Sequence, residues 1–390
     1  MSYIEWTRRH VAALRLVGGL TSLFWLAACA DDDKPSSVSD AASPVGAAPD
    51  ASLTTPDATG PATDDATAPT TQDSGRPSVS SDAGGTTPVD AGAQPDASAA
   101  ASGDSGAPDA GPSDAGAAIS ARPLSTGLTL PDMKESPGAE PIFDVYRPAD
   151  MAAAMAATGR RLPVVVWANG GCFRAVTPWE PLLKRWAAAG FVVLGLSVKP
   201  DGGILDALGS TTQVEHGKQI DWLLEQANKP GSPYAGKIDS DMIVAAGNSC
   251  GGVTAMELAS KDPRVRAVFV LSGSSAVGSA NAGVVNAIKV PVGFVVGNAQ
   301  DDIAAPNALM DFQLLKTPAM IVNRSMGDHL MVSTDTTVLA EVADIALNWM
   351  DLSLYGNKQA AAALNAPTVC GKCTAGMWKL QAKMLEALEK

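Results

Sequence analysis

The chain has 390 residues, a formal net charge of −13 and 46% apolar side chains, enough to build a sizeable core. The negative charge lies in one segment, because residues 1–30 have a balance of +2, residues 31–120 of −13 and residues 121–390 of −2. No segment is strongly basic, which argues against a protein that binds nucleic acid through a basic face.

The first thirty residues have the pattern of an export signal. Arg8 and Arg9 precede an apolar run over residues 11–25, which is short for a membrane span. The Leu-Ala-Ala-Cys sequence that ends at Cys29 resembles a bacterial lipobox, in which the cysteine becomes the lipidated N-terminus. Residues 1–29 are therefore expected to be a lipoprotein signal peptide, and an ordinary signal peptide with an incidental cysteine is the alternative.

Residues 30–120 consist mainly of Ala, Asp, Ser, Thr, Pro and Gly and contain no aromatic residue. Such a segment cannot bury enough apolar surface to offset the entropy lost on ordering, so a disordered linker is expected. Together with a lipidated Cys29, it would tether a domain to the bacterial cell envelope. Ala30 stands where lipoproteins kept at the inner membrane of enteric bacteria have Asp, which favours the outer membrane or the cell surface.

Residues 121–390 alternate short apolar runs with longer amphipathic segments, and they are expected to form one domain. Strands are predicted at residues 162–167, 191–198, 242–247, 265–272, 290–297 and 319–322. Helices are predicted at residues 179–190, 220–227, 249–260, 338–349 and 377–388. This alternation predicts an α/β fold with a doubly wound, mostly parallel sheet and helices on both faces.

The strongest chemical signal is Gly247-Asn248-Ser249-Cys250-Gly251, a Gly-x-Ser-x-Gly pattern between a predicted strand and a predicted helix. In this context the serine lies on a strained turn that presents its hydroxyl above the sheet, and the small flanking residues let the helix pass close to the strand. Ser249 is the expected nucleophile, and a turn whose serine only caps the helix is the alternative. With Cys250 as nucleophile, Asn248 would stand where a glycine belongs, so the spacing favours Ser249.

A serine hydroxyl needs a base to take its proton, and the chain has three histidines. His10 leaves with the expected signal peptide. His216 opens an amphipathic helix, where a solvated or capping role is expected. His329 follows the last predicted strand and fits the chain order Ser, acid, His of α/β-hydrolases, so it is the expected base.

A carboxylate must orient the imidazole and stabilise its cation. Asp301 and Asp302 follow the strand predicted at residues 290–297, where the acid of such a triad emerges. Two adjacent side chains generally cannot both point at one histidine, and position alone leaves both candidates open. Asp328 is disfavoured, because a direct neighbour of His329 rarely aligns its carboxylate with the ring.

A further donor to an oxyanion hole is expected in the loop after the first predicted strand. The sequence there is Asn169-Gly170-Gly171-Cys172, which is comparable to the His-Gly-Gly-Gly loop of esterases. Glycines let the backbone approach a substrate and turn its N–H groups inward. Gly171 and Cys172 are the expected donors, with the N–H of Cys250 as their partner, and an ordinary strand-ending turn is the alternative.

Taken together, these motifs resemble those of a known superfamily. Residues 140–375 are similar to secreted serine α/β-hydrolases grouped with cutinase-like polyester hydrolases, chlorophyllase-like proteins and dienelactone-hydrolase-like proteins. More narrowly, they resemble an uncharacterised microbial branch in which an Asp-Ile-Ala stretch supplies the acid. That stretch begins at Asp302, so the resemblance favours Asp302 over Asp301. It also implies the α/β-hydrolase fold, although Asn169 replaces the histidine common in esterase loops.

Without Cys29, four cysteines remain, an even number in a domain expected to be exported, where disulfides form. Cys370 and Cys373 could pair locally, and Cys172 could pair with Cys250 if both flank the oxyanion hole. A redox-active Cys-x-x-Cys is disfavoured because no thioredoxin-like βαβ pattern surrounds it. Further ligands for zinc are lacking, so neither a metal nor a cofactor is expected.

The sequence thus predicts a serine hydrolase, with a carboxylic ester hydrolase as the first interpretation and a small-molecule or polymeric ester as substrate. A peptidase or amidase could use the same triad, although about 270 residues leave little room for the cap or propeller that such enzymes often carry. A catalytically idle surface-binding module is the third interpretation. Three aromatic side chains near the proposed loop could line an acyl pocket or pack in the core: Trp167, Phe173 and Trp179.

Overall fold

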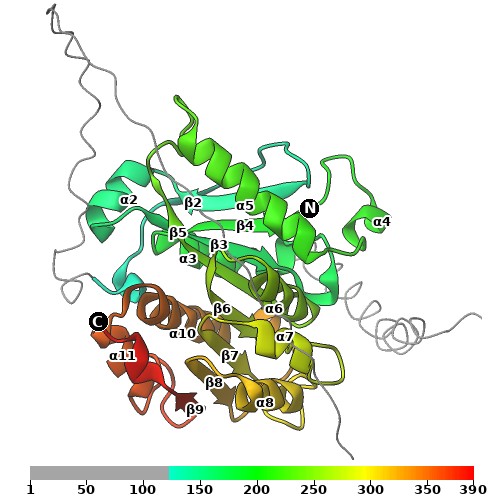
Figure 1. Cartoon of the computed structure of the whole chain (residues 1–390), viewed down its shortest axis with the longest axis vertical. Coiled ribbons are helices and arrows are strands. Elements are labelled where there is room, and N and C mark those ends of the chain that lie inside the picture. Colours follow the sequence, from blue (N-terminus) through cyan, green and yellow to red (C-terminus); the bar gives the residue numbers. More distant parts are fainter. Residues whose placement is uncertain (1–122) are drawn as a thin grey trace, which may run out of the picture. The chain divides into compact units, whose positions relative to one another are not determined.

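Nine strands form one mixed sheet in the computed structural model of the chain, which describes residues 123–390 (Figure 1). The signal peptide expected at residues 1–29, its lipidation site Cys29 and the linker expected at residues 30–120 lie outside the described residues. Between residues 123 and 390, no helix combines the length and the apolar character needed to cross a membrane.

The strand order in the sheet is β1-β2-β4-β3-β5-β6-β7-β8-β9. The six strands from β4 to β8 in this order are parallel, whereas β1, β2 and β9 run antiparallel to their neighbours. The strands are β1 Asp132–Glu135, β2 Phe143–Pro148, β3 Leu162–Ala168, β4 Val192–Leu196, β5 Ile238–Asn248, β6 Val265–Leu271, β7 Val292–Val296, β8 Ala319–Arg324 and β9 Trp378–Lys383.

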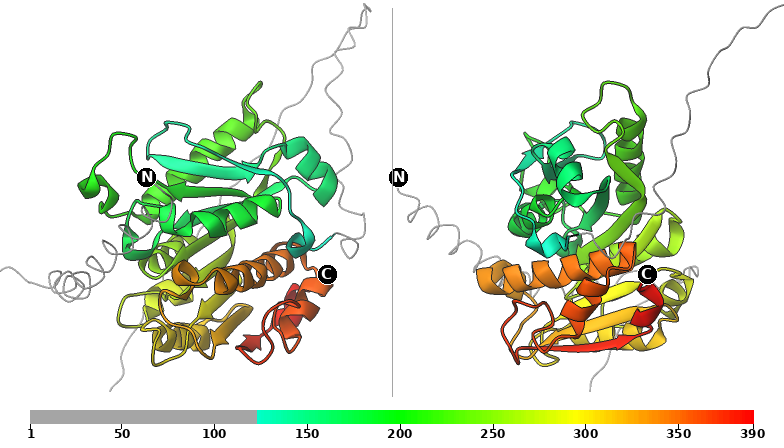
Figure 2. Two further views of the ribbon diagram at one scale, coloured as in Figure 1. Left: turned by 180° about the vertical axis from the view of Figure 1, so that it is seen from behind. Right: turned by 90° about the vertical axis from the view of Figure 1, so that its left-hand side faces the viewer.

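Helices cover both faces of the sheet, which confirms the predicted α/β class (Figures 1 and 2). Helices α3, α10 and α11 pack on one face, and α2, α5, α6, α7 and α8 pack on the other. The α-helices are α2 Met151–Thr158, α3 Glu180–Ala188, α4 Ile204–Ala207, α5 Gln213–Asn228, α6 Cys250–Lys261, α7 Ala282–Ala287, α8 Ala305–Leu314, α9 Met331–Thr334, α10 Thr336–Tyr355 and α11 Lys358–Asn365.

Alternation along the central strands divides the apolar core into two layers. In β3, Val165 and Trp167 pack toward α3 and α10, whereas Val164 and Val166 pack toward α5 and α6. All four side chains are buried, because a parallel strand covered on both faces is apolar on both faces. The continuous apolar run in the sequence therefore forms the strand that it predicts.

The helix predicted at residues 377–388 is wrong. Trp378–Lys383 form strand β9, paired antiparallel with β8, and Leu385–Leu388 form a short 3-10 helix. Gly376 and Met384 have φ values of 76° and 57°, which end the strand on both sides. The unpaired backbone edge of β8 needs hydrogen-bonding partners, and this pairing prevails over the helical spacing of the apolar side chains.

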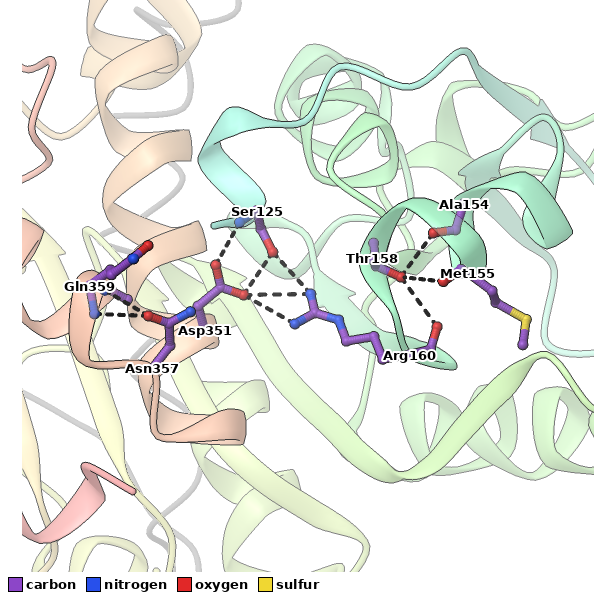
Figure 3. A network of polar contacts seen from close by, with 9 residues as sticks. Ser125, Ala154, Met155, Thr158, Arg160, Asp351, Asn357 and Gln359 are labelled. Atoms are coloured by element: carbon purple, nitrogen blue, oxygen red, sulfur yellow. Dashed lines mark hydrogen bonds and ion pairs between the residues drawn. The ribbon is translucent and has the colours of Figure 1, made fainter. Parts of the chain in front are cut away.

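A buried polar network ties the start of the described chain to α10 (Figure 3). The carboxylate of Asp351 accepts hydrogen bonds from the Ser125 backbone N–H and hydroxyl, both at 2.7 Å. Arg160 Nη1 lies 3.4 Å from Asp351 Oδ1, and Arg160 Nη2 donates to Ser125 Oγ at 2.9 Å. Burial raises the pKa of Asp351, against the opposing effect of Arg160 and Ser125.

The position of this network shows where the chain enters the domain. Asp351 lies near the end of α10, and Arg160 comes just before β3 begins. Farther along, the Leu130 N–H donates to the carbonyl of Ala188, which ends α3 just before β4. These contacts lie at the edge of the sheet where its parallel strands begin.

Candidate active site

Ser249 follows β5 directly and lies at the opposite edge, where the parallel strands end. Its φ of 54° and ψ of −121° are strained values for a residue with a side chain. A Cβ on Gly247 would meet the carbonyl of Gly251, and a Cβ on Gly251 would meet the carbonyl of Ala168. Only glycine therefore fits on either side of the serine, as the sequence pattern predicts.

The structure brings Ser249, His329 and Asp302 together, although each follows a different strand. Nε2 of His329 lies 2.8 Å from Oγ of Ser249, and Nδ1 lies 2.8 Å from Oδ1 of Asp302. Asp302 is fully buried, while the histidine side chain is 19% exposed. The half-buried imidazole thus connects the Ser249 hydroxyl, whose residue is 8% exposed, to a carboxylate in the interior.

Asp302 is held as a carboxylate by the groups around it. Burial raises its pKa, but hydrogen bonds from His329 and from the N–H groups of Gly297 and Ala304 outweigh that effect and hold the pKa below its usual value. An ionised carboxylate only accepts hydrogen bonds, so Nδ1 of His329 carries the proton. In the neutral ring Nε2 is then an acceptor, and it faces the Ser249 hydroxyl.

The other two aspartates point elsewhere. Asp301 accepts a hydrogen bond from Nδ2 of Asn298 at 2.6 Å, and Oδ1 of Asp328 accepts one from the Leu330 N–H at 2.9 Å. Of the two candidates that follow β7, Asp302 lies against His329 and Asp301 does not.

The loop after β3 forms a single 3-10 turn at Gly170–Cys172. Gly171 and Cys172 both have positive φ values, 68° and 53°. Nδ2 of the buried Asn169 lies within hydrogen-bond distance of the carbonyls of Phe173, Arg174 and Leu196. Asn169, which stands where esterases commonly have histidine, therefore fixes the path of this loop through its side-chain amide.

Two disulfides join the four cysteines in the expected pairs. Cys172 is bonded to Cys250 with a Cα–Cα distance of 5.2 Å, and Cys370 is bonded to Cys373. Cys250 begins α6, and within residues 123–390 its N–H donates no hydrogen bond to another group of the chain. The residues proposed as oxyanion donors thus lie next to each other and next to Ser249.

The surface role expected for His216 is wrong. Its side chain is buried in α5, with a residue exposure of 1%, and Nδ1 lies 2.7 Å from Oε1 of Gln219. Burial lowers the pKa of His216 to about 4. The sequence reasoning missed this because Thr212 and Glu215 form the cap of α5, which leaves His216 on the face that packs inward.

The three aromatic side chains near the loop divide between core and site. Trp167 is fully buried against Trp186, with ring centroids 5.6 Å apart. Trp179 and Phe173 are half-buried. A Cβ on Gly170 would meet the ring of Trp179, and a Cβ on Gly171 would meet the ring of Phe173. These two rings therefore lie against the glycines of the loop.

Exposed apolar side chains, which the sequence reasoning missed, lie on or next to α4 and close to Asp302 and His329 in the sequence. Helix α4 contacts the loop after β3, because the Arg174 N–H donates to the carbonyl of Ala207 and the Thr211 N–H to that of Cys172. The others are neighbours of the triad residues along the chain. We call this set the apolar rim: Ile204, Leu205, Leu208, Ile303, Met326 and Leu330.

The described residues also bear on the predicted lack of metal ligands. Between residues 123 and 390, no group of three or more His, Cys, Asp or Glu side chains is arranged to hold a metal ion.

Comparison with known proteins places the chain in a family. A family model described as PET hydrolase-like matches residues 144–364, more than half of the chain. The chain belongs to the PET hydrolase-like family. This confirms the predicted α/β-hydrolase superfamily and identifies a hydrolase that acts on esters. The part of this PET hydrolase-like protein that matches contains Ser249, Asp302 and His329. No curated protein matches the chain.

Proposed function

We propose that the protein is a carboxylic ester hydrolase that works through a Ser-His-Asp triad and an acyl-enzyme intermediate. The observation that carries the proposal is the continuous contact from Ser249 through His329 to Asp302. The Ser249 hydroxyl attacks the acyl carbonyl while Nε2 of His329 takes its proton, and Asp302 stabilises the imidazolium that forms. His329 then protonates the leaving alkoxide, and a water molecule releases the acid from Ser249 by the same path.

The negative charge that develops on the carbonyl oxygen needs hydrogen-bond donors. We assign this role to the N–H of Cys250 and to the N–H groups of Gly171 and Cys172. The N–H of Cys250 at the start of α6 has no hydrogen-bond partner among residues 123–390, which supports the assignment, since the positive end of a helix favours an anion. In other serine hydrolases, removal of one such donor costs about 3–4 kcal/mol of transition-state stabilisation.

The apolar rim supports an ester with an apolar acid or alcohol part as substrate. Leu205, on α4, and Ile303, next to Asp302 in the sequence, are 83% and 67% exposed. Exposed apolar side chains on segments that adjoin the site offer surface to the apolar part of an ester. Both a small-molecule and a polymeric ester fit this surface, and we further propose that Cys29 anchors the enzyme in the bacterial cell envelope, at the outer membrane or cell surface.

The test compares Ser249→Ala with Ser260→Ala, a second serine replaced on the adjacent helix α6. With p-nitrophenyl acetate and butyrate as substrates, Ser249→Ala should be inactive and Ser260→Ala should match the wild type. A fluorophosphonate probe should label the wild type and Ser260→Ala only. Turnover or labelling retained in Ser249→Ala would refute the proposal.

The same assay distinguishes the two other interpretations. Matched ester and amide substrates of one acyl group should show a much larger kcat/KM for the ester. A preference for the amide would indicate a peptidase or amidase, and a wild-type protein that neither turns over nor takes the probe would indicate an idle binding module. A panel of esters graded by acyl length, with a polymeric ester added, defines the substrate.

A further inference from the structure

One covalent bond joins the two sides of the proposed oxyanion hole. Cys172 ends the turn after β3, and Cys250 begins α6 directly after Ser249. Their disulfide spans 78 positions of sequence and holds the two Cα atoms 5.2 Å apart. The backbone N–H groups of these same two residues are two of the three assigned to the oxyanion, and the third is that of Gly171.

The turn after β3 has a backbone that needs external support. Gly171 and Cys172 are consecutive residues with positive φ, and Cys172 has a side chain, which makes this conformation unfavourable. Glycines such as Gly170 and Gly171 have many accessible backbone conformations in the absence of restraints. The direction of the N–H groups in this turn therefore depends on contacts made by its neighbours.

Hydrogen bonds and one covalent bond supply that support. Nδ2 of Asn169 bonds the carbonyl of Phe173, and the Thr211 N–H donates to the carbonyl of Cys172. Both hydrogen bonds hold the turn against β3 and the α4 region. The disulfide is the covalent attachment of the turn to α6, which carries the opposite donor, and Cys172 Sγ also lies 3.8 Å from Oγ1 of Thr254 in that helix.

We propose that Cys172 and Cys250 are positioning residues, whose disulfide sets the distance and orientation between the oxyanion donors of the turn and the N–H of Cys250. This inference rests on the proposed esterase function. The bond acts on the transition state, because donors fixed before the reaction stabilise the oxyanion without reorganising. Loss of the bond should lower kcat and leave KM nearly unchanged, since the apolar rim, which would bind the ground state, stays in place.

The bond is also placed where a dithiol can reach it. Cys172 and Cys250 are half-buried, whereas Cys370 and Cys373 are buried. A thiolate of the dithiol attacks one sulfur and forms a mixed disulfide, and its second thiolate then closes a cyclic disulfide. Two electrons and two protons pass to the protein, which leaves two cysteine thiols.

The experiment uses the whole chain in two matched double variants. Cys172→Ala with Cys250→Ala keeps both backbone N–H groups and removes the bond together with the Sγ contact to Thr254, and Cys370→Ala with Cys373→Ala removes the other disulfide. With p-nitrophenyl butyrate, well below each melting temperature, the first variant should lose at least tenfold in kcat with KM within about twofold. Its affinity for a phenylboronic acid, which forms a tetrahedral adduct with the serine, should fall in parallel. The second variant should keep wild-type values.

Reduction of the wild-type protein provides a second test, which does not depend on whether a variant folds. Dithiothreitol should lower kcat to the level of the first variant, and reoxidation should restore it, with thiol labelling used to identify the reduced pair. The first variant should not respond to the reagent. An unchanged kcat in the first variant, or in wild-type protein shown to carry reduced Cys172 and Cys250, would overturn the inference. Absence of turnover and fluorophosphonate labelling in the oxidised wild type would instead refute the proposed function.

Discussion

His329 and Asp302 meet from loops that follow neighbouring parallel strands, with Nδ1 of the imidazole 2.8 Å from Oδ1 of the buried carboxylate. The carboxylate is held in place by the backbone N–H groups of Gly297 and Ala304 as well. Its position is therefore set by β7 and the loop that follows, independently of the histidine. The imidazole is oriented by a rigid acceptor.

Asp302→Asn should lower kcat by about 10⁴-fold, because the amide replaces the acceptor that fixes the proton on Nδ1 of His329, and this substitution has that effect in serine proteases. Asp301→Asn is the matched control and should stay within about twofold of the wild type, since Asp301 contacts Asn298 instead. Steady-state kinetics with p-nitrophenyl butyrate measures both. If the effects were reversed, Asp302 would not be the acid.

Gly251→Ala should destabilise the fold by about 1–3 kcal/mol, because the added Cβ meets the backbone of Ala168 and Asn169. Gly217→Ala offers the opposite case in a neighbouring helix. A Cβ on Gly217 has nothing within 4 Å, so this change should stabilise α5 by about 0.5–1 kcal/mol. Urea denaturation gives both values. Equal free energies of unfolding for the two variants would contradict the tight approach of α6 to β3.

His216 should make the protein less stable in acid. Its pKa is about 4 in the folded state and about 6.5 in the unfolded state, so between these values the unfolded chain binds the proton and the folded chain does not. Unfolding free energy therefore falls as the pH drops from 6.5 to 4, by about 3 kcal/mol from this group. Denaturation curves of the wild type and His216→Gln at pH 7 and pH 4 test this. The variant should lose less stability on acidification, and an identical loss in both would exclude the assignment.

Arg160→Met should destabilise the protein by about 3–5 kcal/mol, because it leaves the buried carboxylate of Asp351 without its cation. Arg161→Met changes the adjacent arginine, which is exposed, and should remain within about 0.5 kcal/mol of the wild type. Thermal and urea unfolding report the difference. A stable Arg160→Met protein would show that Ser125 alone satisfies Asp351.

The sequence contained enough to locate the six parallel strands and to select Ser249 and His329 as site residues. Continuous apolar runs such as that of β3 form buried parallel strands, and the Gly-x-Ser-x-Gly pattern between a strand and a helix fixes the place of Ser249. Of the three histidines, only His329 then fits the chain order Ser, acid, His, so it is the expected base. Each of these signals can be read directly along the sequence, so none of them requires knowledge of which segments pack together in the fold.

The features that the sequence did not predict depend on contacts between distant segments. The apolar residues of β9 have helical spacing, and only the edge of β8 makes them a strand. His216 is polar at the start of an amphipathic helix, and its burial follows from how α5 packs on the sheet. The positions of Asp301 and Asp302 in the sequence likewise did not decide which of them contacts His329. The direction of a side chain in a loop depends on the backbone of that loop.

The contacts of Ser125 and Leu130 place the N-terminal entry of the domain and Ser249, the proposed nucleophile, at opposite ends of the parallel strands. A support coupled to the protein ahead of residue 123 would therefore attach to the domain on the side away from Ser249. Immobilisation through the N-terminus should leave the catalytic end free to meet a solid substrate, whereas coupling through the loops after β7 or β8 should obstruct it.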